Sequence, residues 1–209
     1  VLDTDTTVHT LFGNQMGARK GYNPKNKGKK SYQPILTFLA ETKEYIAGEL
    51  RNGDRPTGKQ IAAHLQMVFA AVPTMVKTLL ARADSGFYCW DAAQAYESVQ
   101  CGFIIVARKT ARLVEELKVA EWPGSPRTDA DGQCEFWYQP DGWGKAYRFL
   151  ALRYEKQPKV GAADAVEQYQ LFETSKYSYR VFVTYMEGSA HARAAFFNQR
   201  AAAANPIKE

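Results

Sequence analysis

Apolar and polar positions along the first fifty residues follow the pattern of β-strands. Residues 1–8 are rich in Val and Thr with alternating character, and residues 35–40 and 44–50 also form strand-like runs. We therefore expect the chain to begin with a three-stranded meander. Residues 19–30, between the first two strands, are basic and broken by Gly and Pro, which is the composition of a loop or a hairpin tip.

Helical spacing begins after this meander. Residues 59–71 place apolar side chains at a helical period, and Thr57 stands where an N-cap is expected. Residues 76–84 predict a strand, residues 90–99 a helix, and residues 102–107 a buried strand because their apolar run is unbroken. Three strands followed by helix, strand, helix and strand give the element order of a ribonuclease H-like fold. We therefore predict an α/β protein in which helices flank a mixed sheet.

The second half of the chain is rich in aromatic residues. Residues 135–138, 146–152 and 179–185 are strongly β-forming, and Asp141-Gly142 marks a turn between the first two of these strands. The chain is accordingly divided into residues 1–112, the first part of the ribonuclease H-like core; residues 113–186, a β-rich insertion; and residues 187–209, a C-terminal helix of the core.

Composition limits the partners that we expect. The 209 residues include 27 Lys and Arg against 22 Asp and Glu, a formal net charge of +5, which favours a polyanionic partner. No apolar run approaches the ~20 residues needed to cross a bilayer, so we expect no membrane partner. The three cysteines form no Cys-x-x-Cys pair and predict reduced thiols in a cytosolic protein. Because the first residue is Val1, we expect a fragment of a longer chain.

Three aspartates are the main candidates for chemistry. Asp3 and Asp5 lie two apart in the first predicted strand and therefore project from the same face. Asp84 ends a predicted strand and precedes Ser85-Gly86, and α/β sheets usually place their chemistry where a strand gives way to such a turn. Carboxylates from two strands suit Mg²⁺, which takes few protein oxygens and leaves room for phosphates. The alternative is that these aspartates form turns and cap helices.

Several short segments form an ordered set along nearly the whole chain. They are residues 1–8, 18–24, 81–87, 103–109, 147–154 and 196–200. Each is weak alone, but together and in this order they resemble the DDE transposases of bacterial insertion sequences, and the DDE group 1 subfamily in particular. The resemblance implies a ribonuclease H-like fold, cleavage and transfer of DNA strands, and Mg²⁺ or Mn²⁺ as the cofactor.

The resemblance also assigns residues. The first acid of the family directly precedes Thr-Thr, which selects Asp5 over Asp3, and the second acid corresponds to Asp84. Both are therefore expected to be catalytic and to hold the metal. The third acid of the family stands four residues after the arginine of a Tyr-x-x-Arg-x-x-x-Glu helix. Arg200 matches that arginine, whose family role is to contact DNA, but Ala204 occupies the position of the third acid.

Basic residues suggest where DNA would bind. Residues 19–30 contain six basic residues and no acid, which suits phosphate contact, although a solvated hairpin tip has the same composition. The DNA-binding residues that we expect are Arg19, Lys20, Lys25, Lys27, Lys29, Lys30 and Arg200. Trp137 and Trp143 could stack on unpaired bases, but such residues more often belong to the core of a sheet.

Two functions follow from these observations. The first is the catalytic domain of a DDE-type DNA transposase, impaired because Ala204 replaces the third acid and Pro206 disfavours a helix at that point. Glu187 is the remaining candidate for a third acid. The alternative is a non-catalytic, DNA-binding remnant of a transposase, and a purely structural domain is a third reading. In the first two readings the partner is DNA, with self-association on DNA ends, in the bacterial cytoplasm at the nucleoid.

Overall fold

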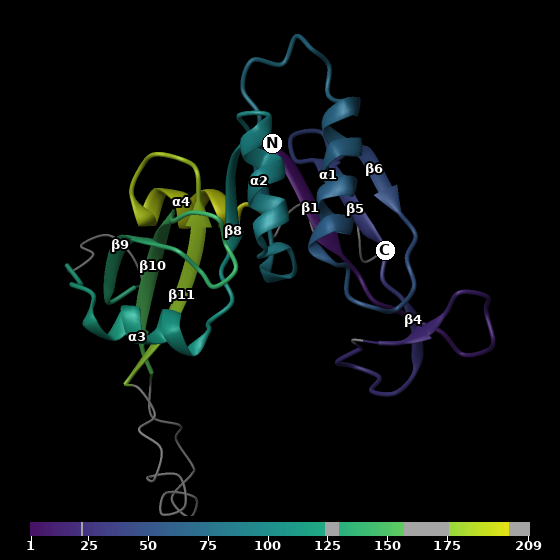
Figure 1. Cartoon of the computed structure of the whole chain (residues 1–209), viewed down its shortest axis with the longest axis horizontal. Coiled ribbons are helices and arrows are strands. Elements are labelled where there is room, and N and C mark those ends of the chain that lie inside the picture. The colour runs from purple at the N-terminus through teal and green to yellow at the C-terminus, as the bar shows by residue number, and fades with distance from the viewer. Residues whose placement is uncertain (22, 124–129, 157–175, 201–209) are drawn as a thin grey trace, which may run out of the picture.

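The computed structural model describes residues 1–21, 23–123, 130–156 and 176–200. Its main feature is an eight-stranded sheet with the strand order β6-β5-β1-β7-β8-β11-β10-β9. Three short strands form a second sheet in the order β2-β4-β3 (Figure 1). Within the described ranges, no helix is long and apolar enough to cross a membrane.

Five strands of the main sheet have the ribonuclease H-like topology. They are β6 (Tyr45–Glu49), β5 (Ile35–Leu39), β1 (Leu2–Thr6), β7 (Leu80–Ala83) and β8 (Gly102–Val106). β1, β7 and β8 run parallel to one another, whereas β5 pairs antiparallel with both β1 and β6. The prediction of an α/β protein with a ribonuclease H-like mixed sheet is therefore confirmed.

The aromatic-rich strands continue this same sheet. β11 (Tyr177–Thr184) pairs antiparallel with β8, and β10 (Tyr147–Glu155) and β9 (Gly132–Tyr138) follow in that order. After β8 the chain passes through α3 (Ala111–Val119) before it enters β9. The segment between β8 and α4 thus lengthens the core sheet on one side, while the exact domain boundaries given above stay a prediction.

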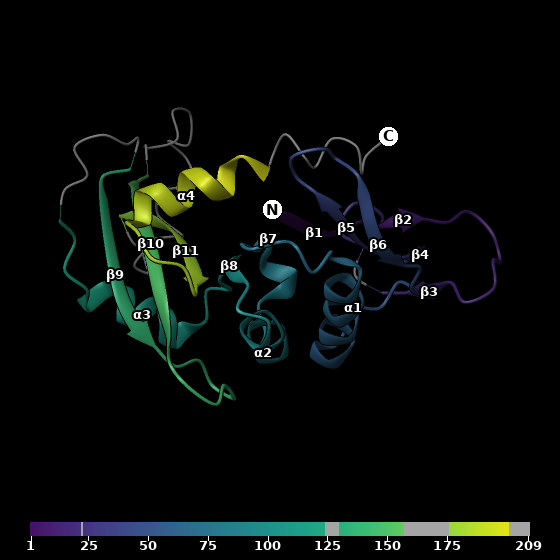
Figure 2. The same cartoon turned by 90° about the horizontal axis from the view of Figure 1, so that it is seen from above.

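Helices cover both faces of the sheet, as Figure 2 shows. α1 (Gly58–Ala71), α2 (Trp90–Ser98) and α3 lie on one face, and α4 (Ala190–Asn198) lies on the other. The core on the first face includes Ile61, Leu65, Tyr96, Phe103, Leu113 and Phe149. The core under α4 includes Ile104, Leu150, Phe182, Ala194 and Phe197. The sheet is therefore buried on both sides where α4 crosses it.

Local sequence explains where α1 begins. The side chain of Thr57 accepts a hydrogen bond from the backbone N–H of Gln60, and the Gln60 side chain accepts one from the Thr57 N–H. This capping box confirms the helix predicted for residues 59–71. The strand predicted for residues 76–84 is shorter, because an exposed loop precedes β7 and the strand begins only at Leu80.

The first strand also ends earlier than expected, because the chain leaves the main sheet after Thr6. The arm, residues 9–32, then forms β2 (His9–Thr10), β3 (Arg19–Lys20) and β4 (Lys30–Tyr32) with their connecting loops. It projects at the end of the molecule opposite to β9 (Figure 2). The chain returns directly into β5, whose first residue pairs with Thr6.

Candidate active site

Asp5 and Asp84 lie next to each other at the ends of two adjacent parallel strands. The last residue pair between β1 and β7 joins Thr4 to Ala83. Asp5 follows Thr4, and Asp84 follows Ala83. Neighbouring strands are about 4.8 Å apart, so both side chains begin from adjacent backbone positions. In the sheet, β1 has β5 as its other neighbour and β7 has β8, so the chain continues in opposite directions from the β1–β7 pair. Ligands of open α/β sheets bind at such a point, beyond the carboxyl ends of the strands, and the two acids lie there.

Asp5 is held by its own strand and by the end of α4. Its Oδ1 accepts a hydrogen bond of 2.8 Å from the Thr6 N–H and lies 3.0 Å from Nη2 of Arg200. Burial raises the pKa of Asp5 above its usual value of 3.8, and Arg200 opposes this effect. The negative charge of Asp84 raises the pKa further, so the two carboxylates are electrostatic neighbours.

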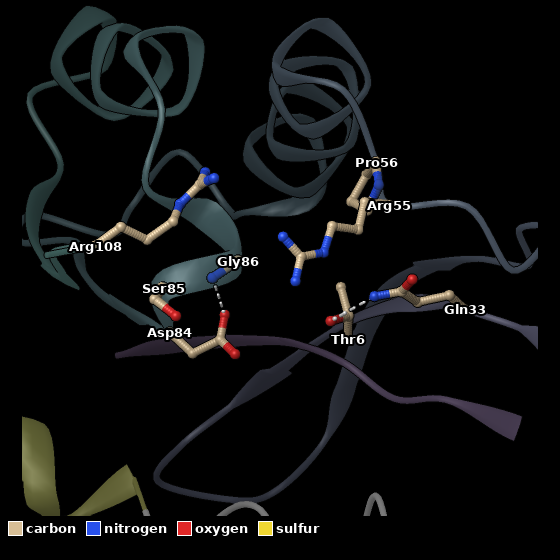
Figure 3. Close-up of a pocket in the computed structure, with 8 residues that line it drawn as sticks. All are labelled: Thr6, Gln33, Arg55, Pro56, Asp84, Ser85, Gly86 and Arg108. Carbon is tan, nitrogen blue, oxygen red and sulfur yellow. Dashed lines mark hydrogen bonds between the residues drawn. The ribbon is translucent and has the colours of Figure 1, made fainter. Parts of the chain in front are cut away.

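Asp84 has a structural role as well as a place in the site. Its Oδ1 accepts a hydrogen bond of 2.8 Å from the Gly86 N–H and caps the short 3₁₀ turn Ser85–Phe87. Capping was the alternative reading of this residue, and here it fixes the direction of the carboxylate. Asp84 also lines a cavity of about 190 Å³, whose other walls are Thr6, Gln33, Arg55, Pro56, Ser85, Gly86 and Arg108 (Figure 3).

Asp3 projects from the same face as Asp5 but is engaged in a buried ion pair. Nε and Nη2 of Arg82 each lie 2.6 Å from a different carboxylate oxygen of Asp3, and both side chains are almost completely buried. Nη1 of Arg82 donates to the backbone carbonyl of Phe196 in α4. Both oxygens of Asp3 are therefore used by the fold, which gives a physical reason for the preference for Asp5.

Arg200, two residues after the end of α4, contacts Asp5 and is a predicted site residue that the described part of the chain brings to the acids. Its Nη2 donates to the Thr4 carbonyl at 3.1 Å as well as contacting Asp5, and its guanidinium lies over the ring of Phe197. Ala204 lies outside the described residues. Glu187 precedes α4, at the opposite end of the helix from Arg200, so the structure does not bring it to Asp5 and Asp84.

The pair of carboxylates fits a divalent metal. Asp5 and Asp84 offer hard oxygen ligands, and Mg²⁺ binds through only one or two protein carboxylates together with water and phosphate. In the described part of the chain, no group of three or more His, Cys, Asp and Glu residues could hold a metal ion. Asp5 and Asp84 are the residues that could hold such an ion, and Arg200 already balances part of the charge of Asp5.

The arm and the acids lie at the same end of β1, because the arm follows the C-terminal end of that strand. Arg19, Lys20, Lys25, Lys27 and Lys29 are exposed, and Lys30 is partly buried. Arg19 forms an ion pair of 3.1 Å with Asp54, and Lys30 donates to the Asn14 side chain at 3.2 Å. The other four lysines extend from the arm.

Two tryptophans occupy different environments. Trp143 is buried and packs against Tyr88 and Tyr147, so it belongs to the core. Trp137 is 74% exposed and lines a separate cavity with Tyr185 and residues that follow β11. β11 runs antiparallel to β8, so this cavity is at the edge of the sheet opposite to Asp84.

Sequence reasoning missed Arg55 and Arg108, which line the cavity beside Asp84. Arg108 comes two residues after the end of β8, and the ends of parallel strands meet at one edge of a sheet. Its position after a buried strand was a usable signal. Arg55 lies in the connection between β6 and α1, where no local pattern indicated a site.

The fold is that of a ribonuclease H-like protein. The chain belongs to the family described as Transposase DDE domain group 1, which matches residues 1–209. A solved piggyBac transposase, in a synaptic complex with hairpin DNA, has a similar structure with a TM-score of 0.60 at 13% sequence identity. The match covers 99% of this chain and 39% of the piggyBac chain, so this chain spans about two-fifths of that protein. None of the curated proteins matches the sequence significantly.

Proposed function

We propose that the chain is the catalytic domain of a DDE-type DNA transposase, which cleaves and transfers DNA strands with Mg²⁺ or Mn²⁺. The observation that carries the proposal is the adjacency of Asp5 and Asp84 at the ends of β1 and β7 in a member of the transposase DDE family. Phosphoryl transfer on DNA requires an activated attacking oxygen and a stabilised leaving oxygen. Divalent ions held by carboxylates supply both.

The residues around the acids have distinct roles in this proposal. Asp5 and Asp84 would hold the ion, which when bound activates the attacking oxygen and stabilises the leaving one. The N–H groups of Thr6 and Gly86 orient the two carboxylates. Arg200 balances part of the charge of Asp5 and links the end of α4 to β1. A metal site of this kind depends on ligands held in fixed directions.

We propose further that this chain cleaves DNA poorly. Ala204 stands where the family pattern has its third acid, so a second metal ion would lack a ligand. Pro206 disfavours a helix at that point of the sequence. The same two residues favour the alternative function, a non-catalytic remnant that still binds DNA.

DNA is the proposed partner under either function. The arm supports this proposal, because it presents exposed lysines and follows the end of β1, the strand that carries Asp5. The similar piggyBac structure was determined as a synaptic complex with DNA, which supports DNA binding and self-association on DNA ends as parts of the proposal. A bacterial cytoplasmic location at the nucleoid completes it.

A plasmid-nicking assay with Mg²⁺ or Mn²⁺ tests the catalytic function. The proteins to compare are the parent, the Ala204→Glu/Pro206→Leu variant, and that variant with Asp84→Ala as the matched control. We expect metal-dependent nicking in the double variant, little or none in the parent, and none in the control. Nicking that persists after Asp84→Ala would contradict the assignment of Asp84.

A second outcome separates the two candidate functions. If the double variant binds DNA but neither protein nicks it, the DNA-binding remnant becomes the better description. If the parent is fully active, sensitive to Asp84→Ala and indifferent to position 204, the third acid has been misplaced and the proposed impairment is wrong.

A further inference from the structure

The cavity beside Asp84 contains two cations to which the proposed chemistry gives no role. We propose that Arg55 and Arg108 form a phosphate-binding site, which holds a phosphodiester of the DNA strand next to Asp84. This inference rests on the proposed function, because it requires that the chain binds DNA. It adds a substrate-positioning site on two residues to which no role was assigned from the sequence.

Arg108 is fixed in direction by its neighbours. Its Nη2 donates to the backbone carbonyl of Tyr88 at 2.7 Å, and its guanidinium lies 5.9 Å from the centre of the Tyr88 ring. Tyr88 is buried in the core, so the contact anchors the arginine to a rigid part of the protein. A guanidinium has five N–H groups in a planar fork, and the bond to Tyr88 uses one of them.

Arg55 enters the cavity from the other wall. It precedes Pro56 and the capping residue Thr57, so the proline restricts its backbone and α1 begins three residues further on. Figure 3 shows the side chains of Arg55 and Arg108 extending into the same opening, with the turn at Gly86 between them. The two guanidinium groups come from different elements and converge on one space.

The charges and size of the cavity suit a phosphate group. Two arginines and one aspartate carry the charges of its lining, so the cavity is net positive before any metal binds. Its volume of about 190 Å³ accommodates a phosphate group rather than a whole base pair. Arginine binds phosphate oxygens through two parallel N–H bonds, and the hydroxyl groups of Thr6 and Ser85 add further donors in the same lining.

The position beside Asp84 favours a DNA phosphodiester over a free anion. A backbone phosphate brought to Asp84 would be repelled by that carboxylate, and the two arginines offset the repulsion. The arm follows β1 at the same edge of the sheet, so a strand held by the arm lysines would pass this cavity. Arg55 and Arg108 would then fix the register of the strand against the metal-binding acids.

DNA-binding measurements on the full chain test the site. The affinity of a fluorescent duplex of about three helical turns is measured over a range of salt concentrations for the parent and for Arg55→Gln/Arg108→Gln. The matched control is Lys43→Gln/Lys77→Gln, which removes two exposed charges before β6 and before β7, at the opposite edge of the sheet. In the arginine variant only, we expect the slope of log affinity against log salt to fall by about 0.9 for each phosphate that is no longer neutralised.

A second measurement locates the contact on the DNA. Single phosphates of the duplex are replaced in turn by neutral methylphosphonates, and binding of each duplex is compared for the parent and the arginine variant. One or two replacements should weaken binding to the parent and have no effect on the variant. Arg55→Lys/Arg108→Lys should retain most of the salt slope while reducing this position-specific effect, because lysine lacks the planar fork.

Three outcomes are decisive. If the parent binds DNA and the arginine variant keeps the same salt slope and the same methylphosphonate profile, the two-arginine site is overturned. The proposed function is then left intact. A parent that does not bind DNA would overturn both. The site would be established if the arginine variant shows a reduced salt slope and no position-specific effect of the methylphosphonates. Its far-UV circular dichroism and urea midpoint must match those of the parent.

Discussion

Arg82 and Asp3 form a buried ion pair with two hydrogen bonds of 2.6 Å, and the same guanidinium donates to the carbonyl of Phe196 at 2.9 Å. β1, β7 and α4 are therefore joined at a single side chain. Phe196 precedes Arg200 by about one helical turn, and Arg200 contacts Asp5. The Arg82 contact thus holds the part of α4 that delivers Arg200 to the candidate site.

Breaking this ion pair should destabilise the protein strongly. Arg82→Met leaves the Asp3 carboxylate buried without its partner, and removal of one member of a buried pair typically costs about 3–5 kcal/mol. Urea unfolding followed by circular dichroism measures the change. The double variant Asp3→Leu/Arg82→Met removes both charges and should recover much of this stability. Equal unfolding midpoints for the parent and Arg82→Met would show that the pair contributes little.

Removing the charge of Asp84 should lower the pKa of Asp5. The negative charge of Asp84 is one of the causes that raise this pKa, so Asp84→Asn removes a repulsion. Arg200→Gln should shift it in the opposite direction, because it removes the cation that opposes burial. Carboxyl ¹³C NMR titration of the metal-free protein measures both. Asp54→Asn, on a residue that pairs with Arg19 near the arm, is the control and should leave Asp5 unchanged.

Stability should depend on pH through His64. This buried histidine forms a 2.8 Å hydrogen bond with Thr37, which in turn bonds Thr4 in β1, and burial lowers the pKa of His64 below its usual value of 6.5. The unfolded chain therefore binds a proton at a higher pH than the folded protein does. The contribution of His64 to stability is complete above pH 6.5 and disappears as the pH falls toward the lower folded pKa.

This dependence is tested by measuring the free energy of unfolding over a range of pH. The range runs from about one pH unit above the usual histidine pKa to about one and a half pH units below it. His64→Gln should show a weaker decline in stability over that range, because the titrating group is absent. His191→Gln replaces an exposed histidine on α4 and should leave the decline unaltered. A decline of the same steepness in all three proteins would assign it to other groups.

Neutralising the arm should weaken DNA binding without regard to sequence. Replacing Lys25, Lys27, Lys29 and Lys30 with glutamine removes four cations, and the salt dependence of affinity should flatten by about 0.9 log unit for each phosphate that the arm no longer neutralises. The measurement is a salt titration with two duplexes of unrelated sequence. The Lys43→Gln/Lys77→Gln protein serves again as the reference. An unchanged slope would remove the arm from the DNA interface.

The sequence predicted those parts of the fold that depend on local patterns. The capping box of Thr57 and Gln60 and the apolar period of α1 lie within one short segment, so α1 was predictable. The mixed sheet flanked by helices followed from the succession of strands and helices. The late start of β7, relative to the strand predicted for residues 76–84, was not predictable. Residue 79 in the loop and residue 80 in the strand are both apolar, so the sequence does not mark the boundary between them.

The candidate site was predictable only in part, for a physical reason. Asp5 lies in one predicted strand and Asp84 ends another, and the pairing of these strands brings the two residues together. The bond between Arg82 and Asp3 joins residues 79 positions apart, and neither one has a local pattern that identifies the other. Arg55 and Arg108 likewise meet only through the packing of α1 and β8 around the cavity. Their shared space is a property of the folded chain.

The contact between Arg200 and β1 also bears on the order in which the protein is made. Arg200 lies 196 positions after Thr4, and β9, β10 and β11 are all synthesised between them. A nascent chain that stops between Asp84 and α4 contains both acids but lacks the guanidinium that balances Asp5. Unfinished translation products therefore carry an incomplete centre. Any property of the centre that depends on Arg200 can therefore appear only after β9, β10 and β11 have been made.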